Sequence, residues 1–126
     1  MGILFHRAKE GRDPTEPMTE TAWCTKGYSL AALGRFEEAV AAYDRAIVLK
    51  PDYADAWAGR GTTLAALGRR EEAVASFDRA IALKPEDTMA WYGKGVSLAA
   101  LGRFEEAMAA YDRTVCLLYT SDAADE

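Results

Sequence analysis

Apolar residues recur along this chain at the spacing of one face of an α-helix. Trp23, Gly27 and Leu30 occupy positions i, i+4 and i+7, so they fall on the same side of a helix. A second set follows at the same spacing: Ala39, Tyr43 and Ala46. The glycine of LGRF and LGRR can end the first helix, and the proline of LKPD and LKPE cannot continue the second. The pattern therefore predicts pairs of helices joined by short turns.

The helix pair occurs three times in succession. Tryptophans stand 34 positions apart, at Trp23, Trp57 and Trp91, and the sequences around them are closely similar. The predicted organisation is a flexible leader over residues 1–19, followed by repeat units over 20–53, 54–87 and 88–115. The residues predicted to cap the first helix of each unit are Thr19, Asp52 and Asp87.

Each first helix also carries a glycine in its middle, at Gly27, Gly61 and Gly95. Glycine in a helix interior costs about 1 kcal/mol relative to alanine, so another helix must pack closely at this point to offset the cost. We expect the matching small surface to come from the alanines of the second helices, Ala39, Ala73 and Ala107.

The units resemble the tetratricopeptide repeat (TPR) in four respects. These are the 34-residue period, the W-x-x-x-G opening, the later series of alanine, an aromatic residue (Tyr or Phe) and alanine, and the closing proline. The resemblance covers residues 20 to about 115. It implies an all-α fold, an α-solenoid of tandem helix-turn-helix units wound into a right-handed superhelix. It also implies a non-catalytic protein-protein interaction scaffold, which binds a peptide or a partner helix in the concave groove formed by the first helices. One departure is that Lys26, Arg60 and Lys94 stand where the family often has leucine, which predicts stems along the core and charges in water.

The positions that face the groove in this family carry small, weakly polar and apolar residues here, of which Tyr28, Met89 and Tyr92 are the largest. Two interpretations stay open. Either the surface is unused, or it binds an apolar partner segment anchored by Tyr28 and Tyr92, since aromatic residues dominate interface hot spots. The second is favoured. The inward-facing positions are Thr21, Cys24, Thr25, Tyr28 and Ala32, then Asp55, Ala58, Gly59, Thr62 and Ala66, then Met89, Tyr92, Gly93, Val96 and Ala100.

One specific activity of the family is not expected. Members that bind chaperones grip a C-terminal carboxylate with Lys, Asn and Arg side chains in the groove. None of the matching positions is basic or an amide here, so a carboxylate would find no charge-assisted partner. These positions are Cys24, Tyr28, Gly59, Met89 and Gly93.

Composition narrows the function further. The net charge of −5 argues against a nucleic-acid surface, and no apolar run approaches the roughly 20 residues that span a bilayer. The start of the chain lacks the apolar stretch of a signal peptide, so a cytoplasmic protein with two free cysteines, Cys24 and Cys116, is expected. The lone His6 makes neither a metal site nor a catalytic triad, and no glycine-rich phosphate loop is present. We therefore expect no enzymatic activity and no cofactor.

The last eleven residues, CLLYTSDAADE, break the pattern. They resemble the translation of a sequencing-library transposon adapter, which in this frame encodes Cys-Leu-Leu-Tyr-Thr-Ser-Asp-Ala-Ala-Asp. The resemblance implies that residues 116–126 are a non-native tail on a truncated third unit. This tail carries three acidic residues and no basic one, so the net charge without it would be −2 instead of −5. Since no proline stops the last helix, Leu117, Leu118 and Tyr119 can nevertheless extend it.

Two further functions stay open beside the scaffold. The chain is a self-assembly module if exposed repeat ends stack between copies, because the last helix has no following unit to cover its apolar surface and weak self-association is then expected. Alternatively, it is an adaptor or regulatory fragment of a larger multidomain enzyme.

Overall fold

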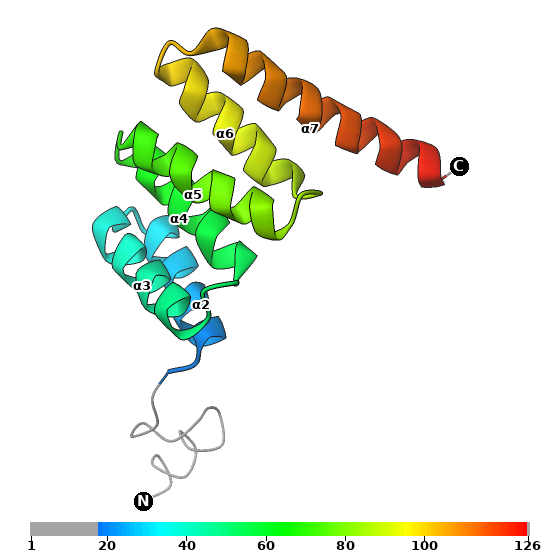
Figure 1. Ribbon diagram of the computed structural model, residues 1–126. Helices are drawn as coiled ribbons and strands as arrows, with labels where there is room; N and C mark the ends of the chain where they lie inside the picture. Colours follow the sequence, from blue (N-terminus) through cyan, green and yellow to red (C-terminus); the bar gives the residue numbers. More distant parts are fainter. Residues whose placement is uncertain (1–17, 126) are drawn as a thin grey trace, which may run out of the picture.

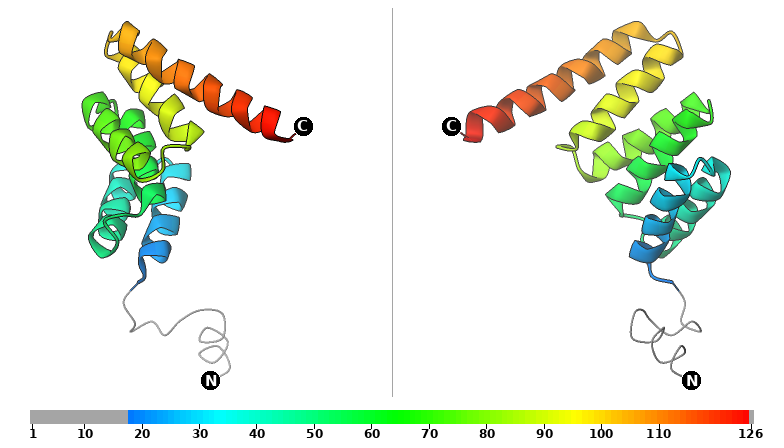
Figure 2. Two further views of the ribbon diagram at one scale, coloured as in Figure 1. Left: turned by 45° about the vertical axis from the view of Figure 1, so that its right-hand side comes forward. Right: turned by 180° about the vertical axis from the view of Figure 1, so that it is seen from behind.

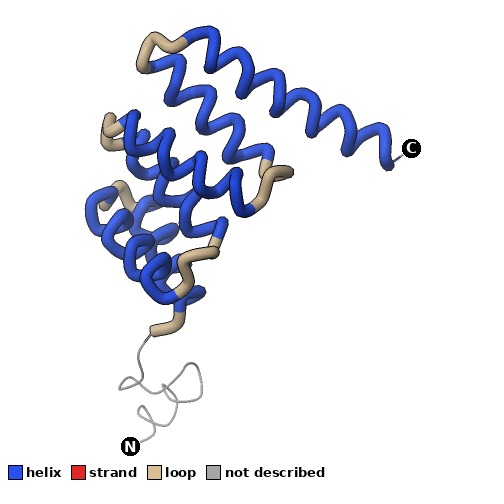
Figure 3. Tube along the Cα trace, viewed as in Figure 1, coloured by secondary structure: helices blue, strands red, loops and turns tan. Residues whose placement is uncertain are grey.

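Helices form the secondary structure of the chain, and no strand occurs among the described residues (Figures 1 and 3). The computed structural model describes residues 18–125, with side chains up to Tyr119. Most of the predicted leader, His6 included, lies outside the described residues. The helices are α2 (Glu20–Ala32), α3 (Phe36–Leu49), α4 (Ala54–Ala66), α5 (Arg70–Leu83), α6 (Thr88–Ala100) and α7 (Phe104–Asp125).

The helices form three antiparallel hairpins that stack in chain order, α2–α3, α4–α5 and α6–α7 (Figure 2). Neighbouring hairpins join through α3 against α4 and α5 against α6, and the first helices also meet in succession, α2 against α4 and α4 against α6. The predicted all-α solenoid of helix-turn-helix units is therefore confirmed.

Glycine ends each first helix, as the sequence predicts. Gly34, Gly68 and Gly102 have φ of about +80°, a conformation that side chains with a Cβ rarely adopt. The amide of Gly34 donates to the Ala31 carbonyl at 3.0 Å and that of Arg35 to the Leu30 carbonyl at 2.9 Å, a Schellman motif. The same pair of bonds closes α4 and α6.

Helix caps follow the prediction at two of the three positions. The Thr19 hydroxyl accepts from the Ala22 amide, and the Asp87 carboxylate accepts from the amides of Met89 and Ala90. Asp52 was the wrong residue, because the N-cap of α4 is Tyr53, which makes no side-chain capping bond. Tyr53 lies 34 positions after Thr19 and 34 before Asp87, so it is the equivalent residue of the repeat.

The neighbour of the mid-helix glycines also differs from the expectation. Ala39, Ala73 and Ala107 are buried, but the groups in closest contact with the glycines are aromatic rings of the second helices. A Cβ at Gly27 would lie 2.9 Å from the Tyr43 ring, and one at Gly61 3.0 Å from the Phe77 ring. Tyr111 contacts Gly95 in the same way. The mid-helix glycines therefore leave space for an aromatic ring to pack against the helix backbone, and a Cβ at these positions would crowd the ring.

The basic residues at the leucine positions do more than reach water. Arg60 Nε lies 2.7 Å from Asp44 Oδ1, and Lys94 Nζ lies 2.7 Å from Asp78 Oδ1, so each cation joins its unit to the preceding one. Their side chains are only 22% and 24% exposed, as expected for stems that lie along the core, and the charged ends also pair with aspartates that are about half exposed. Lys26 is exposed, as expected.

The tryptophans tie the linkers to the following helices. Trp57 Nε1 donates to the Pro51 carbonyl at 2.9 Å, and Trp91 Nε1 donates to the Pro85 carbonyl at 2.8 Å. The tryptophans also carry cations on their faces: Arg60 and Arg79 lie 5.9 and 5.4 Å from the Trp57 ring centroid.

The last helix is longer than its equivalents, with 22 residues against 14 in α3 and α5. Tyr119 stands where Pro51 and Pro85 end the earlier second helices, so nothing in the sequence interrupts the hydrogen-bond ladder. The expected extension through Leu117, Leu118 and Tyr119 is confirmed, and the helix projects beyond α6 at the end of the stack (Figure 1).

Candidate functional site

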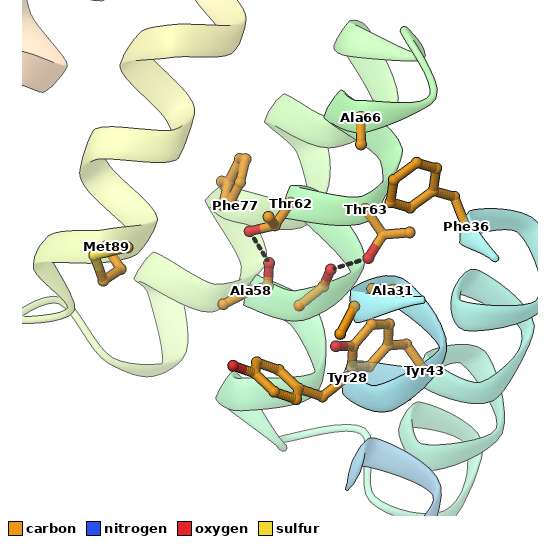
Figure 4. Close-up of a pocket in the computed structure, with 12 residues that line it drawn as sticks. Tyr28, Ala31, Phe36, Tyr43, Ala58, Thr62, Thr63, Ala66, Phe77 and Met89 are labelled. Carbon is orange, nitrogen blue, oxygen red and sulfur yellow. Dashed lines mark hydrogen bonds between the residues drawn. The ribbon is translucent and has the colours of Figure 1, made fainter. Parts of the chain in front are cut away.

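A pocket of about 450 Å³ opens over the junction of the first two units and reaches Met89 of the third, on the side formed by the first helices. Figure 4 shows Tyr28 of α2, Phe36 of α3 and Met89 of α6 around it, with α4 forming its floor. Tyr28 and Met89 are both 72% exposed, and they belong to different hairpins. The lining residues are Tyr28, Ala31, Ala32, Phe36, Tyr43, Ala58, Gly59, Thr62, Thr63, Ala66, Phe77 and Met89.

None of these residues carries a charge, and the hydroxyl groups of both threonines are engaged. The Thr62 hydroxyl donates to the Ala58 carbonyl at 3.1 Å, and the Thr63 hydroxyl donates to the Gly59 carbonyl at 2.8 Å (Figure 4). Burial raises the pKa of Tyr43 from 10.0 to about 12, so its phenol stays neutral well above physiological pH. The pocket therefore offers methyl groups, ring faces and a thioether, and suits an apolar group.

The structure gathers only part of the predicted groove into this pocket. Tyr28, Ala58, Thr62 and Met89 line it, together with the smaller inward positions Ala32, Gly59 and Ala66. The predicted positions outside the pocket are Thr21, Cys24, Thr25, Asp55, Tyr92, Val96, Gly93 and Ala100.

Two of the outlying residues have other contacts. Cys24 packs against the core of the first unit, and burial raises the pKa of its thiol while a hydrogen bond with Tyr53 lowers it. Tyr92 is half exposed and stacks on Tyr111, with ring centroids 6.0 Å apart and planes tilted by 48°. The two predicted anchors, Tyr28 and Tyr92, therefore do not share one pocket.

Comparison with known proteins decides the family. A model of the tetratricopeptide repeat family matches the chain twice, in two overlapping segments, residues 24–87 and 60–125. The chain belongs to the tetratricopeptide repeat family. This is generally a fold of protein-interaction modules.

Solved TPR structures resemble the chain at low sequence identity. The second TPR of Spaghetti (RPAP3), bound to the HSP90 peptide SRMEEVD, matches with a TM-score of 0.77 and 23% identity over 79% of this chain and 93% of that one. MamA matches with a TM-score of 0.80 and 22% identity over 83% of this chain and 61% of that one. YrrB, a TPR protein with an unusual peptide-binding site, matches with a TM-score of 0.75 and 24% identity over 80% of this chain and 52% of that one. No curated protein was found to be similar in sequence.

Sequence reasoning missed the pocket residues that come from the second helices. Phe36, Tyr43 and Phe77 lie outside the first helices, which alone were expected to line the TPR groove, and Ala31 and Thr63 were likewise not predicted. A signal was present, because Phe36 follows directly on the LGR turn that ends the first helix. Its side chain therefore starts at the rim of the groove.

The TPR period also explains why the pocket lies at the first junction. Ala58 is replaced by Tyr92 in the next unit, and Phe36 by Arg70. The second junction therefore carries the ring of Tyr92, which contacts Tyr111, where the first has only the methyl group of Ala58.

Other kinds of site are not indicated in the part of the chain that the structure describes. Residues 18–125 hold no cluster of three or more His, Cys, Asp or Glu side chains that could bind a metal. Of the described helices, none combines the length and apolar character that a bilayer crossing requires.

Proposed function

We propose that this TPR chain is a non-catalytic interaction scaffold that holds an apolar segment of a partner protein in the pocket between α2, α4 and α6. The observation that carries the proposal is the uncharged pocket beneath two exposed side chains, Tyr28 and Met89. Large exposed apolar groups beside a concave surface are typical of interaction sites. We propose a cytoplasmic setting for this interaction, and neither nucleic acid nor membrane as the partner.

The chemistry of the pocket specifies what the segment presents. A partner side chain that is aromatic or branched aliphatic would cover Ala58 and Thr62 while Tyr28 and Met89 close over it. Burial of such a side chain contributes about 1.5–3 kcal/mol, enough to make it the anchor of the complex. A charged side chain would lose its hydration and gain no partner.

The same reasoning separates this chain from RPAP3, whose second TPR binds the acidic peptide SRMEEVD. No basic or amide side chain lines the pocket. We expect SRMEEVD to bind to this chain no more tightly than a scrambled peptide of the same composition when both are measured by isothermal titration calorimetry. Tight binding of SRMEEVD that is lost in Tyr28→Ala would contradict the proposed specificity.

Selection from a random peptide library displayed on phage tests the scaffold proposal directly. The wild-type chain should enrich peptides with aromatic and branched aliphatic residues. Ala58→Tyr should lose this enrichment, because it fills the pocket with the side chain that the next unit carries at the equivalent position. Ala75→Tyr adds the same side chain at an exposed position of α5 outside the pocket and should retain the enrichment. Equal selection by all three proteins would reject the pocket as the binding site.

A further inference from the structure

Both junctions between hairpins are built in the same way. The ring of Tyr43 lies between Gly27 of its own unit and Gly59 of the next, and a Cβ at Gly59 would come within 2.5 Å of the ring. Phe77 lies in the same way between Gly61 and Gly93, where a Cβ would come within 2.4 Å. These separations are shorter than real Cβ atoms show, so each junction accepts only glycine on the incoming helix.

A charge pair accompanies the ring at each junction. The residue after the accepting glycine is basic in both units, Arg60 and Lys94. Each cation lies 2.7 Å from an aspartate of the preceding hairpin, Asp44 or Asp78. An incoming hairpin is therefore recognised by a glycine followed directly by lysine or arginine on its first helix.

The outer face of α7 presents the same features without a following hairpin among the described residues. Tyr111 contacts Gly95 on one side, as Tyr43 contacts Gly27. Met108 is 63% exposed, whereas its equivalents Val40 and Val74 are 7% and 8% exposed. Asp112 occupies the position of Asp44 and Asp78. Figure 2 shows this face at the end of the stack.

The first helix of the chain matches only half of this recognition pattern. Lys26 stands in the place of Arg60 and Lys94 and could pair with Asp112 of another copy. Thr25, however, stands in the place of Gly59 and Gly93. Its Cβ and the two groups attached to it would enter the space that the ring of Tyr111 needs.

We propose that the outer face of α7 is a docking surface for a further TPR-type hairpin that presents Gly-Lys or Gly-Arg on its first helix, and that Thr25 prevents a second copy of this chain from occupying it. The ring of Tyr111 selects the glycine, and the carboxylate of Asp112 selects the cation. Met108 supplies the apolar contact that Val40 and Val74 supply inside the stack.

The full-length Thr25→Gly variant tests the proposal, because it gives the chain the complete Gly-Lys pattern. Glycine is tolerated at the equivalent positions 59 and 93, so the fold is expected to persist. In sedimentation velocity, Thr25→Gly should associate head to tail with a dissociation constant at least ten times lower than that of the wild type. Thr25→Ala is the matched control, since it removes most of the side chain but keeps the excluded Cβ, and it should remain as dissociated as the wild type.

Charge reversal identifies the surface. Adding Asp112→Lys to Thr25→Gly should return the protein to the dissociated state, and adding Lys26→Asp as well should restore association. Circular dichroism verifies that each variant is folded. The proposal is overturned if Thr25→Gly associates no more than Thr25→Ala, if the wild type associates equally well, or if association ignores the charges at 26 and 112.

Discussion

The ring of Tyr43 lies so close to the backbone of Gly59 that a Cβ at position 59 would approach it to 2.5 Å. Tyr43 is 3% exposed and belongs to α3, whereas Gly59 lies in the middle of α4, the first helix of the next hairpin. One aromatic side chain thus fills the core of its own unit and also sets how near the next unit can approach.

This contact makes alanine at position 59 destabilising, although alanine is the better helix former. Overpacking costs about 1–3 kcal/mol, and the gain in helix propensity of about 1 kcal/mol offsets only part of it. We expect Gly59→Ala to lower the midpoint of urea unfolding monitored by circular dichroism. Thr25→Ala, at the equivalent position without a preceding ring, should leave the midpoint unchanged or raise it. A rise in both variants would show that the ring moves aside freely.

Arg60 has a role that its equivalent Lys94 lacks. Its guanidinium donates to the buried hydroxyl of Ser76 at 2.7 Å in addition to pairing with Asp44. Arg60→Met leaves this hydroxyl without its donor, which we expect to lower the free energy of unfolding by about 1–3 kcal/mol. Lys94→Met removes a partly exposed ion pair and the contact with the Trp91 ring but leaves no buried group without a partner, so it should cost about 1 kcal/mol or less.

The double variant Arg60→Met/Ser76→Ala separates the two contributions. The other units carry alanine at the equivalent positions, Ala42 and Ala110, so the substitution suits the fold. Unfolding titrations should show that the second substitution recovers part of the loss. No recovery would mean that the guanidinium acts through its charge alone.

Alkaline pH should weaken the fold through Tyr43. Burial raises the pKa of this phenol from 10.0 to about 12. Between these pH values the unfolded chain releases the proton while the folded chain keeps it, so stability is lost as the pH rises above 10 and is unaffected below. Tyr43→Phe, which copies Phe77, should lose less stability over this window in thermal melts than the wild type does. Equal losses of stability in Tyr43→Phe and the wild type would show that groups other than Tyr43 cause the alkaline destabilisation.

The tail offers a test of how far the repeat fold extends. We propose that residues 116–126 are non-native and dispensable for folding, since Cys116, Leu118 and Tyr119 are exposed along the projecting end of α7. Deleting residues 116–126 should leave the midpoint and cooperativity of thermal unfolding nearly unchanged. The total helical signal should fall only by the share of the deleted turns. A large fall in the midpoint would show that the tail packs as part of the third unit.

Much of the fold is predictable from sequence because it depends on local rules. The glycine of each LGR turn reaches a positive φ, proline ends α3 and α5, and its replacement by Tyr119 lets α7 continue. The candidate site was less predictable. The family positions located Tyr28, Ala58, Thr62 and Met89 of the pocket lining, yet they also included Cys24 and Tyr92, which are outside that lining and contact the first core cluster and Tyr111.

The sequence by itself determined the helix pairs, their turns and their 34-residue period, since each follows from helix geometry and the backbone preferences of glycine and proline. Only the tertiary structure decided that Tyr43 rather than Ala39 meets Gly27, that Arg60 pairs with Asp44, and that an uncharged pocket opens beside Ala58. Periodicity specifies which face of a helix is buried. The partner on that face is set by how deep each side chain reaches once the units stack, and that depth differs between Ala58 and Tyr92 although their helices repeat.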